Sequence, residues 1–250
     1  MSTTDFETRL NTLKQIIQNA NHIVFFGGAG VSTESGIPDF RSKDGLYNQH
    51  DVKFENYAPE FLLSHDCLYH HPKVFYEFYR QKMDCRNIEP NITHKKLAEL
   101  EATGKRVSVI TQNIDGLHEK AGNHEIYNIH GTTLRNYCTK CHREFPADAI
   151  FESTEKIPHC PDCHGIGFIR PDVTLYNETL PPAFEDAMKI VKQADVMIVA
   201  GTSLTVYPAA NLVSEFEGNH LVIINRDTTQ ADTYADLVFH ENLGDIFSRL

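Results

Sequence analysis

Two pairs of cysteines constrain this chain more than any other feature of its sequence. Two residues separate Cys138 from Cys141, two separate Cys160 from Cys163, and 18 residues lie between the pairs. Each pair can place two thiolates on one tight turn, and two such turns can complete the tetrahedral ligand set that zinc prefers in proteins. Because protein would fill all four positions and leave none for water, the spacing predicts one structural zinc ion.

Disulfide bonds are the alternative use of these cysteines. The first residues, MSTTDFETRL, lack the charged start and apolar middle of a signal peptide, and no stretch approaches the roughly 18–20 apolar residues of a membrane helix. We therefore expect a cytosolic protein, in which cysteines serve as metal ligands or free thiols more often than in disulfides. The nearby His142, His159 and His164 are interpreted as loop residues.

Charge and length narrow the classes of partner. The chain has 250 residues, enough for one large domain with a modest appendage, and a formal net charge of −11. Such a charge argues against a general affinity for nucleic acid or for anionic membrane surfaces. An acidic surface would tolerate a basic peptide, although a role in solubility alone is the simpler explanation of the negative charge.

Short apolar runs alternate with helical stretches along much of the chain. The runs cover residues 22–26, 107–110, 196–200 and 221–224. Each is typical of a parallel strand that is buried on both faces. Strands of this kind alternating with amphipathic helices predict an α/β fold with a doubly wound, Rossmann-like parallel sheet.

Two regions interrupt this alternation and predict a smaller inserted module. Residues 42–95 are aromatic and helical in character, and residues 131–168 are rich in Cys, His, Pro and Gly. We expect the first to form the helical part and the second the zinc-ribbon part of a small domain beside the sheet. The sheet domain would then comprise residues 1–41, 96–130 and 169–250.

A glycine-rich segment follows the first predicted strand. It reads Gly-Gly-Ala-Gly-Val-Ser-Thr over residues 27–33. A strand, then glycines and a helix start can offer backbone N–H groups to a phosphate. The usual dinucleotide fingerprint has a third glycine where this chain has Thr33, and an acidic residue about 20 positions later is also missing. By itself the segment therefore indicates only a phosphate-binding loop.

Further motifs follow in a fixed order. Gly-Ile-Pro-Asp-Phe-Arg-Ser occupies residues 36–42, Thr-Gln-Asn-Ile-Asp-Gly-Leu-His occupies residues 111–118, and His130-Gly131 precedes the first cysteine pair. Gly-Thr-Ser at 201–203 and Ile-Asn at 224–225 follow the last two strands. From about residue 20 to the C-terminus, this order resembles the sirtuin family, and in particular its compact bacterial-type deacetylases. The resemblance implies NAD-dependent removal of acyl groups from protein lysines.

The resemblance also implies which residues bind NAD. The glycine-rich loop and Arg41 suit the pyrophosphate. Ile114 and Asp115 would hydrogen-bond the nicotinamide carboxamide, and Phe40 would shield the reacting face from water. Gln112 and Asn113 would orient the nicotinamide ribose. The full predicted set is Gly28, Ala29, Gly30, Ser32, Thr33, Asp39, Phe40, Arg41, Gln112, Asn113, Ile114, Asp115, His130, Gly201, Thr202, Ser203 and Asn225.

His130 is the expected general base. An imidazole with an ordinary pKa near 6.5 can accept a proton at neutral pH. In sirtuins the matching histidine activates a ribose hydroxyl, which attacks the imidate between ribose C1′ and the acyl oxygen. The products would be free lysine, nicotinamide and O-acyl-ADP-ribose, so the reaction is an acyl transfer to ADP-ribose.

The resemblance further implies that the substrate peptide binds as an added strand. It would lie between two chain segments, with contacts at Val173, Thr174, Leu175, Tyr176, Glu178, Leu204 and Val206. Sirtuins usually carry Phe-Gly-Glu where this chain has Tyr-Asn-Glu at 176–178. Asparagine tolerates left-handed backbone better than most residues, which would preserve this geometry while the peptide preference could differ.

Two other functions compete with deacylation. A mono-ADP-ribosyltransferase would use the same NAD cleavage, but His130 argues against it because transfer to a protein side chain does not need that base. A NAD-sensing or zinc-dependent interaction module would not explain Gln112, Asn113 and Asp115 together with His130.

The helical region predicts a preference for neutral acyl groups. Sirtuins that remove acidic acyl groups resemble one another in a Tyr-x-x-Arg pair one helical turn apart, and here Phe78 and Gln81 align with the pair. Arg80, four residues after Tyr76, offers an alternative register. Without a cation, burying a distal carboxylate costs several kcal/mol.

A succinyl peptide should therefore have a kcat/KM at least about a hundredfold below that of the acetyl peptide, a gap of roughly 2.7 kcal/mol. The measurement compares the two groups on one peptide sequence. Comparable values would mean that a cation lines the acyl tunnel.

Overall fold

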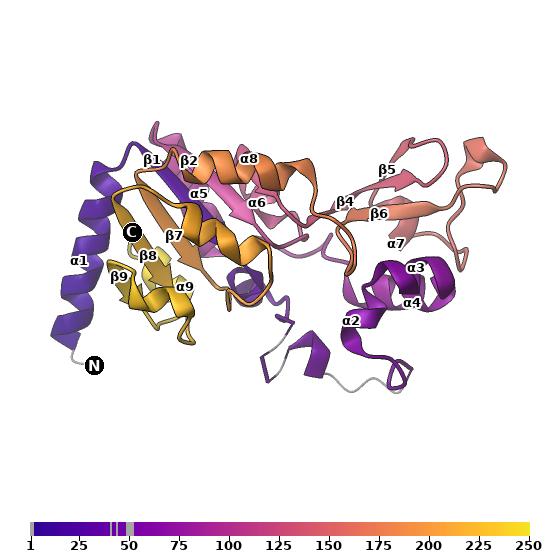
Figure 1. Cartoon of the computed structure of the whole chain (residues 1–250), viewed down its shortest axis with the longest axis horizontal. Helices are drawn as coiled ribbons and strands as arrows, with labels where there is room; N and C mark the ends of the chain where they lie inside the picture. Colours follow the sequence, from indigo (N-terminus) through magenta and orange to yellow (C-terminus); the bar gives the residue numbers. More distant parts are fainter. Residues whose placement is uncertain (1–2, 41, 44, 49–52) are drawn as a thin grey trace.

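Two sheets of different size lie along the long axis of the molecule (Figure 1). The computed structural model describes residues 3–40, 42–43, 45–48 and 53–250. The larger sheet is entirely parallel, with the order β3-β2-β1-β7-β8-β9. Its strands are β1 (His22–Gly27), β2 (Arg106–Thr111), β3 (Glu125–Asn128), β7 (Val196–Ala200), β8 (His220–Ile224) and β9 (Leu237–Phe239).

Helices cover both faces of the larger sheet. On one face pack α1 (Thr3–Asn19), α5 (Ile92–Ala102), α6 (Leu117–Ala121) and α9 (Leu243–Phe247), and on the other α8 (Pro182–Val191) and the 3₁₀ segment η5 (Ala209–Glu215). Within β1, Ile23 and Phe25 face the first layer, whereas Val24 and Phe26 face the second. Burial on both faces is the physical reason for the uninterrupted apolar runs. The predicted doubly wound fold is confirmed.

The four predicted strands correspond to β1, β2, β7 and β8, whereas β3 and β9 were not predicted. The last two are short, with four and three residues, and β3 is only partly buried along its length. Edge strands of this length carry too little apolar periodicity to be distinguished from loops.

The smaller sheet and four helices share one core. The sheet has the order β5-β4-β6, formed by Glu144–Pro146, Gly131–Cys138 and Ile169–Val173, and is antiparallel. The helices are α2 (Pro59–Leu62), α3 (His65–His70), α4 (Pro72–Lys82) and α7 (Asp148–Phe151). The boundary predicted at residue 169 needs correction, because β6 pairs with β4 and thus belongs to the smaller sheet.

Two arginines join the helical and zinc-ribbon parts of this small domain. The Arg80 guanidinium donates to the carbonyl oxygens of Ile150 and Glu155, each at 2.8 Å. Arg86 forms ion pairs with Asp148 and Glu152. These contacts cross from residues 42–95 to residues 131–168, so the two insertions fold as one unit.

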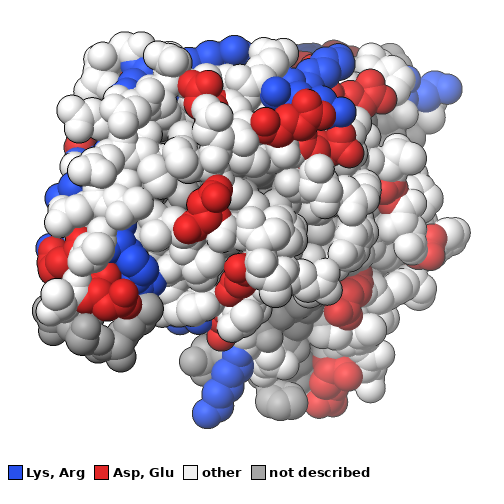
Figure 2. All heavy atoms as spheres, turned by 60° about the vertical axis from the view of Figure 1, so that its left-hand side comes forward, with Lys and Arg blue, Asp and Glu red and all other residues white. Residues whose placement is uncertain are grey.

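The described surface carries charges of both signs. On the face drawn in Figure 2, Lys and Arg side chains stand singly or beside Asp and Glu, and no continuous basic patch crosses its described part. Within the described residues, no helix combines the length and apolar character needed to cross a membrane.

Candidate active site

A cavity of about 830 Å³ opens at the carboxyl ends of the parallel strands. In this strand order the chain runs outward from β1 in both directions, and ligands of such sheets bind at the point where the order reverses. Residues that directly follow β1, β2, β7 and β8 line the cavity, together with the end of α4 and residues 173–178. The volume lies within the range of pockets that enclose small ligands and cofactors.

The cavity gathers most of the predicted NAD-binding residues. Its lining includes Ala29, Gly30, Ser32, Thr33, Asp39, Phe40, Gln112, Asn113, Ile114, Asp115, His130, Gly201, Thr202, Ser203 and Asn225. Gly28 lies beside the cavity and is not part of the lining. Arg41 lies outside the described residues.

The glycine-rich loop differs from the prediction in its backbone. Two short 3₁₀ turns, Ala29–Val31 and Thr33–Ser35, follow β1 in place of an α-helix, and Gly36 at φ 91° ends the second. The amides of Gly28 and Gly30 donate to the carbonyl oxygens of Ala200 and Gly201. The expectation that these amides are free phosphate donors is therefore wrong.

Close packing accounts for the glycines instead. A Cβ on Gly28 would lie 2.7 Å from Cβ of Thr202, and one on Gly30 would lie 2.8 Å from Cα of Gly201. Both distances are shorter than real Cβ contacts. The absence of side chains at these positions lets the loop lie directly on the end of β7.

A buried hydrogen-bond network forms one wall of the cavity. The Ser32 hydroxyl donates to Asp115 Oδ2 at 2.6 Å, and Asn113 Nδ2 donates to Ser32 Oγ at 3.0 Å. Asp115 Oδ1 accepts from the amide of Leu117. Burial raises the pKa of Asp115, although the Ser32 and Leu117 hydrogen bonds oppose the shift. The hydroxyl of Ser32, a residue of the loop predicted to suit the pyrophosphate, therefore holds Asp115 in place.

His130 lies between the two sheets, two residues after β3 and directly before β4. Its Nδ1 lies 3.0 Å from the carbonyl oxygen of Gln112. Because a carbonyl only accepts, the proton of the neutral ring sits on Nδ1 and leaves the lone pair on Nε2. Burial lowers the pKa of His130 below 6.5, and the hydrogen bond to Gln112 opposes this shift only in part. The ring is thus a neutral base at pH 7.

The predicted peptide-binding segments flank the cavity. Val173, Thr174, Leu175, Tyr176, Glu178 and Val206 line it. Leu204 does not, because its side chain is buried in the core beneath α8. Asn177 has φ 70°, in agreement with the left-handed backbone expected there.

The residues assigned to the acyl tunnel need correction. Phe78 packs edge-to-face on Phe54, Gln81 is exposed, and neither lines the cavity. Lys82 and Met83 line it instead, at the end of α4. The alternative residue Arg80 is turned toward α7 by its hydrogen bond to Ile150. Lys82 is thus a cation in the cavity lining, and the comparison of succinyl with acetyl peptide tests whether it acts on the acyl group.

Some acidic residues of the cavity lining were not predicted. Glu34 and Glu241 both line the wall, and Glu34 Oε1 accepts from the amide of Gly244 at the start of α9. Asn242 and Leu243, near which the resemblance implies an adenine contact, also line the cavity. Contacts between such distant parts of the chain have no local signal in the sequence.

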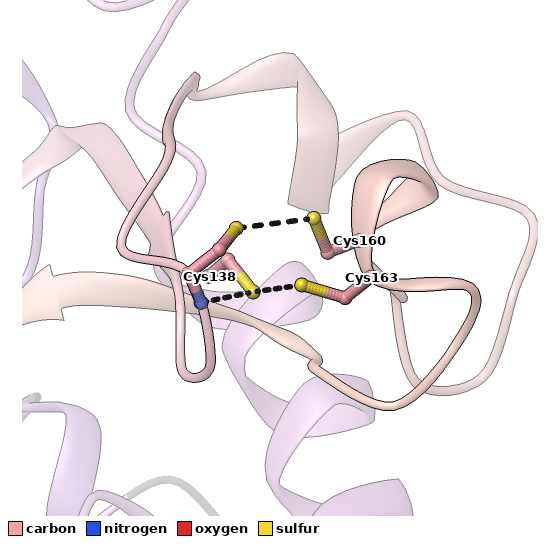
Figure 3. Close-up of side chains that lie close together, drawn as sticks. Cys138, Cys160 and Cys163 are labelled. Atoms are coloured by element: carbon pink, nitrogen blue, oxygen red, sulfur yellow. Dashed lines mark hydrogen bonds between the residues drawn. The ribbon is translucent and has the colours of Figure 1, made fainter.

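The four predicted zinc ligands converge in the small domain. Figure 3 shows sulfur atoms from two loops pointing toward one another, and all four lie within 4.8 Å of one another. Sγ of Cys138 is 3.7 Å from that of Cys163, and Sγ of Cys141 is 3.8 Å from that of Cys160. A zinc tetrahedron with bonds of about 2.3 Å requires sulfur separations of about 3.8 Å. Disulfides, with sulfurs about 2.05 Å apart, do not fit.

Sequence comparison finds a family and curated relatives that this chain resembles. The sequence model of the Sir2 family matches residues 28–208. The NAD-dependent protein deacetylase of Clostridium perfringens is 46% identical over 98% of this chain and 99% of its own length. That of Cutibacterium acnes is 47% identical over 93% of each chain.

Solved structures agree with these sequence relatives. A Sir2 structure with a p53 peptide and NAD⁺ has a TM-score of 0.81 and 34% identity over 96% of both chains. One bound to an acetylated peptide has a TM-score of 0.83 and 32% identity over the same shares. With a six-stranded sheet of this topology, a four-cysteine cluster and these relatives, the chain belongs to the Sir2 family.

Proposed function

We propose that this protein removes acetyl and similar neutral acyl groups from lysines of proteins or peptides, with NAD as co-substrate. The reaction yields free lysine, nicotinamide and O-acyl-ADP-ribose. The observation that carries the proposal is the position of His130, a neutral base at the junction of the dinucleotide-type cavity and the segments 173–178. Relatives named as NAD-dependent protein deacetylases support it.

The lining of the cavity suggests how NAD is held. We assign the nicotinamide to the wall formed by Ile114 and Asp115, and the pyrophosphate to the end of β7 at Thr202 and Ser203. Asn225 would contact the adenosine ribose. Asp115 can accept from the carboxamide N–H₂ group because Ser32 and the Leu117 amide fix its orientation.

His130 would act on the ribose. Once the acyl oxygen has displaced nicotinamide from ribose C1′ to give an imidate, Nε2 would accept the proton of a ribose hydroxyl whose oxygen attacks the imidate carbon. Addition of water would then release the lysine amine and leave O-acyl-ADP-ribose. The hydrogen bond from Nδ1 to the Gln112 carbonyl oxygen keeps the ring oriented and stabilises the imidazolium that forms. Phe40 at the cavity wall would exclude water until the acyl oxygen has attacked.

Product analysis tests the proposal against its two alternatives. The protein is incubated with NAD and either an acetyl-lysine peptide or its unmodified form, and all products are read by mass spectrometry. Deacylation produces equal amounts of nicotinamide, free-lysine peptide and O-acetyl-ADP-ribose, and only with the acetylated peptide. ADP-ribose on the unmodified peptide would indicate a transferase, and absence of nicotinamide release would indicate a NAD sensor.

We further propose that the protein works in the cytoplasm. The support is chemical: two C-x₂-C turns kept as thiolates for zinc suit a reducing compartment.

His130→Ala should lower the deacylation rate by about 10²–10⁴, the range for a lost general base, while NAD still binds. The fold should persist because His130 lines the cavity and is only partly buried, with a side-chain hydrogen bond to Gln112. Steady-state kinetics measures the deacylation rate, and a titration of the same sample measures NAD binding. His124→Ala, an exposed histidine paired with Glu101, is the matched control and should leave the rate unchanged. Near-normal turnover in His130→Ala would remove this residue from the mechanism.

Elemental analysis should find one zinc per chain. Cys138→Ala should lose the metal and the activity together, because a structural zinc site supplies folding free energy to the small domain. Cys67→Ala is the matched control, since this cysteine lies buried in the same core but outside the cluster. It should keep the zinc. An active, purified protein without zinc contradicts the assignment.

A further inference from the structure

Arg170 and Glu178 form a buried ion pair next to the proposed peptide site. The side chains are 8% and 17% exposed, and two hydrogen bonds join guanidinium to carboxylate at 2.7 and 3.0 Å. Burial by itself would raise the pKa of Glu178, but the bonds from Arg170 and Leu175 outweigh it and hold the pKa below its usual value. The pair is therefore charged at neutral pH.

Both side chains also hold the backbone between them. Arg170 Nη2 donates to the carbonyl oxygen of Val173 at 2.9 Å, and Glu178 Oε2 accepts from the amide of Leu175 at 3.0 Å. Residues 173–178, which we name the peptide loop, are thus clamped at both ends by one ion pair. Glu178 had been predicted to contact the peptide, but its carboxylate is occupied by Arg170 and Leu175.

Two other parts of the chain depend on the shape of this loop. The amide of Thr174 donates to the carbonyl oxygen of His130 at 2.8 Å. Tyr176 exchanges two backbone hydrogen bonds with Leu63 and His65, and so connects the loop to the helical part of the small domain. A change in the loop would therefore alter the cavity wall on which the peptide rests.

We propose that Arg170 and Glu178 are positioning residues, which hold the peptide loop in the shape that receives the substrate. The inference rests on the proposed function, because it concerns the same peptide site. Because the loop is already ordered, peptide binding does not have to supply the free energy of ordering the loop. The ion pair therefore increases peptide affinity without contacting the peptide. Removing one partner leaves the other charge buried and unpaired, and the loop must move to hydrate it.

The test compares Glu178→Gln with the wild type in the full-length protein. The KM for an acetyl-lysine peptide should rise about tenfold or more, since the loop must be reordered on binding. The KM for NAD should stay within about twofold, because the NAD wall is formed by other segments. Asp172→Asn is the matched control. Asp172 lies on the same strand as Arg170 but forms a more exposed ion pair with Arg135 of β4, and its loss should leave the peptide KM unchanged.

Two peptides separate positioning from direct contact. One carries neutral residues beside the acetyl-lysine and the other carries basic residues. Positioning predicts the same rise in KM for both, whereas a larger rise for the basic peptide would mean that Glu178 binds the substrate and would overturn the inference. If Glu178→Gln lowers the melting temperature but leaves the KM unchanged for both peptides, the ion pair only stabilises the fold, and the inference is also overturned.

A conservative variant keeps the test decisive if Glu178→Gln does not fold. Glu178→Asp retains the charge but shortens its reach, and should show a smaller rise in peptide KM with the same split from the NAD KM. If the wild type itself releases no nicotinamide with the acetylated peptide, the proposed function fails. If the wild type is active but neither variant changes the peptide KM, only the positioning role fails.

Discussion

The backbone pairing of Gly131 with Val173 is the end of the smaller sheet that lies beside the cavity. Gly131 has φ 79°, and any side chain there would overlap the carbonyl oxygen of Asp172. Only glycine permits so close an approach in this conformation. The same pairing continues into the hydrogen bond between Thr174 and His130. One short ladder therefore holds the proposed base His130 next to the start of the peptide loop.

A second close approach shapes the other side of the site. Gly28 and Gly30 lie against the end of β7, so the loop after β1 and the residues after β7 enclose the cavity together. The hydroxyl of Ser32 then donates a hydrogen bond to Asp115, which follows β2 in the chain. Residues that are distant in the chain meet here because parallel strands deliver their carboxyl ends to one edge. The four-cysteine cluster lies at the edge of the small domain's core, with Cys138 and Cys160 buried and Cys141 exposed, and its four thiolates suit a structural zinc.

Features with a strong local cause could be predicted from the sequence. Strands β1, β2, β7 and β8 are buried on both faces, so their sequences are continuous apolar runs. Tetrahedral metal coordination requires the spacing of the four cysteines. Most residues predicted to bind NAD line the cavity, because their motifs directly follow strands. Features that depend on partners distant in sequence could not be predicted. The amide of Gly28 is occupied by Ala200, and the carboxylate of Glu178 by Arg170.

Helix register explains the remaining error. Aromatic spacing alone placed Phe78 toward the tunnel, but α4 packs its aromatic residues into the core of the small domain and presents Lys82 near its end. Aromatic residues occupy more than one face of α4. The elements that α4 packs against, here α7 and β6, determine which face meets the cavity. Neighbouring strands and helices supply that information, and the sequence of the helix does not contain it.

The protonation state of His130 is the central claim, and the pH dependence of kcat/KM tests it most directly. A base must be neutral to act, so activity is present above its pKa and is lost as the pH falls through it. Because burial lowers the pKa of His130, the acid limb should have its midpoint below 6.5. This limb should be absent from the residual activity of His130→Ala, which distinguishes it from titration of Asp115. A midpoint above 6.5, or the same limb in the variant, would contradict the account.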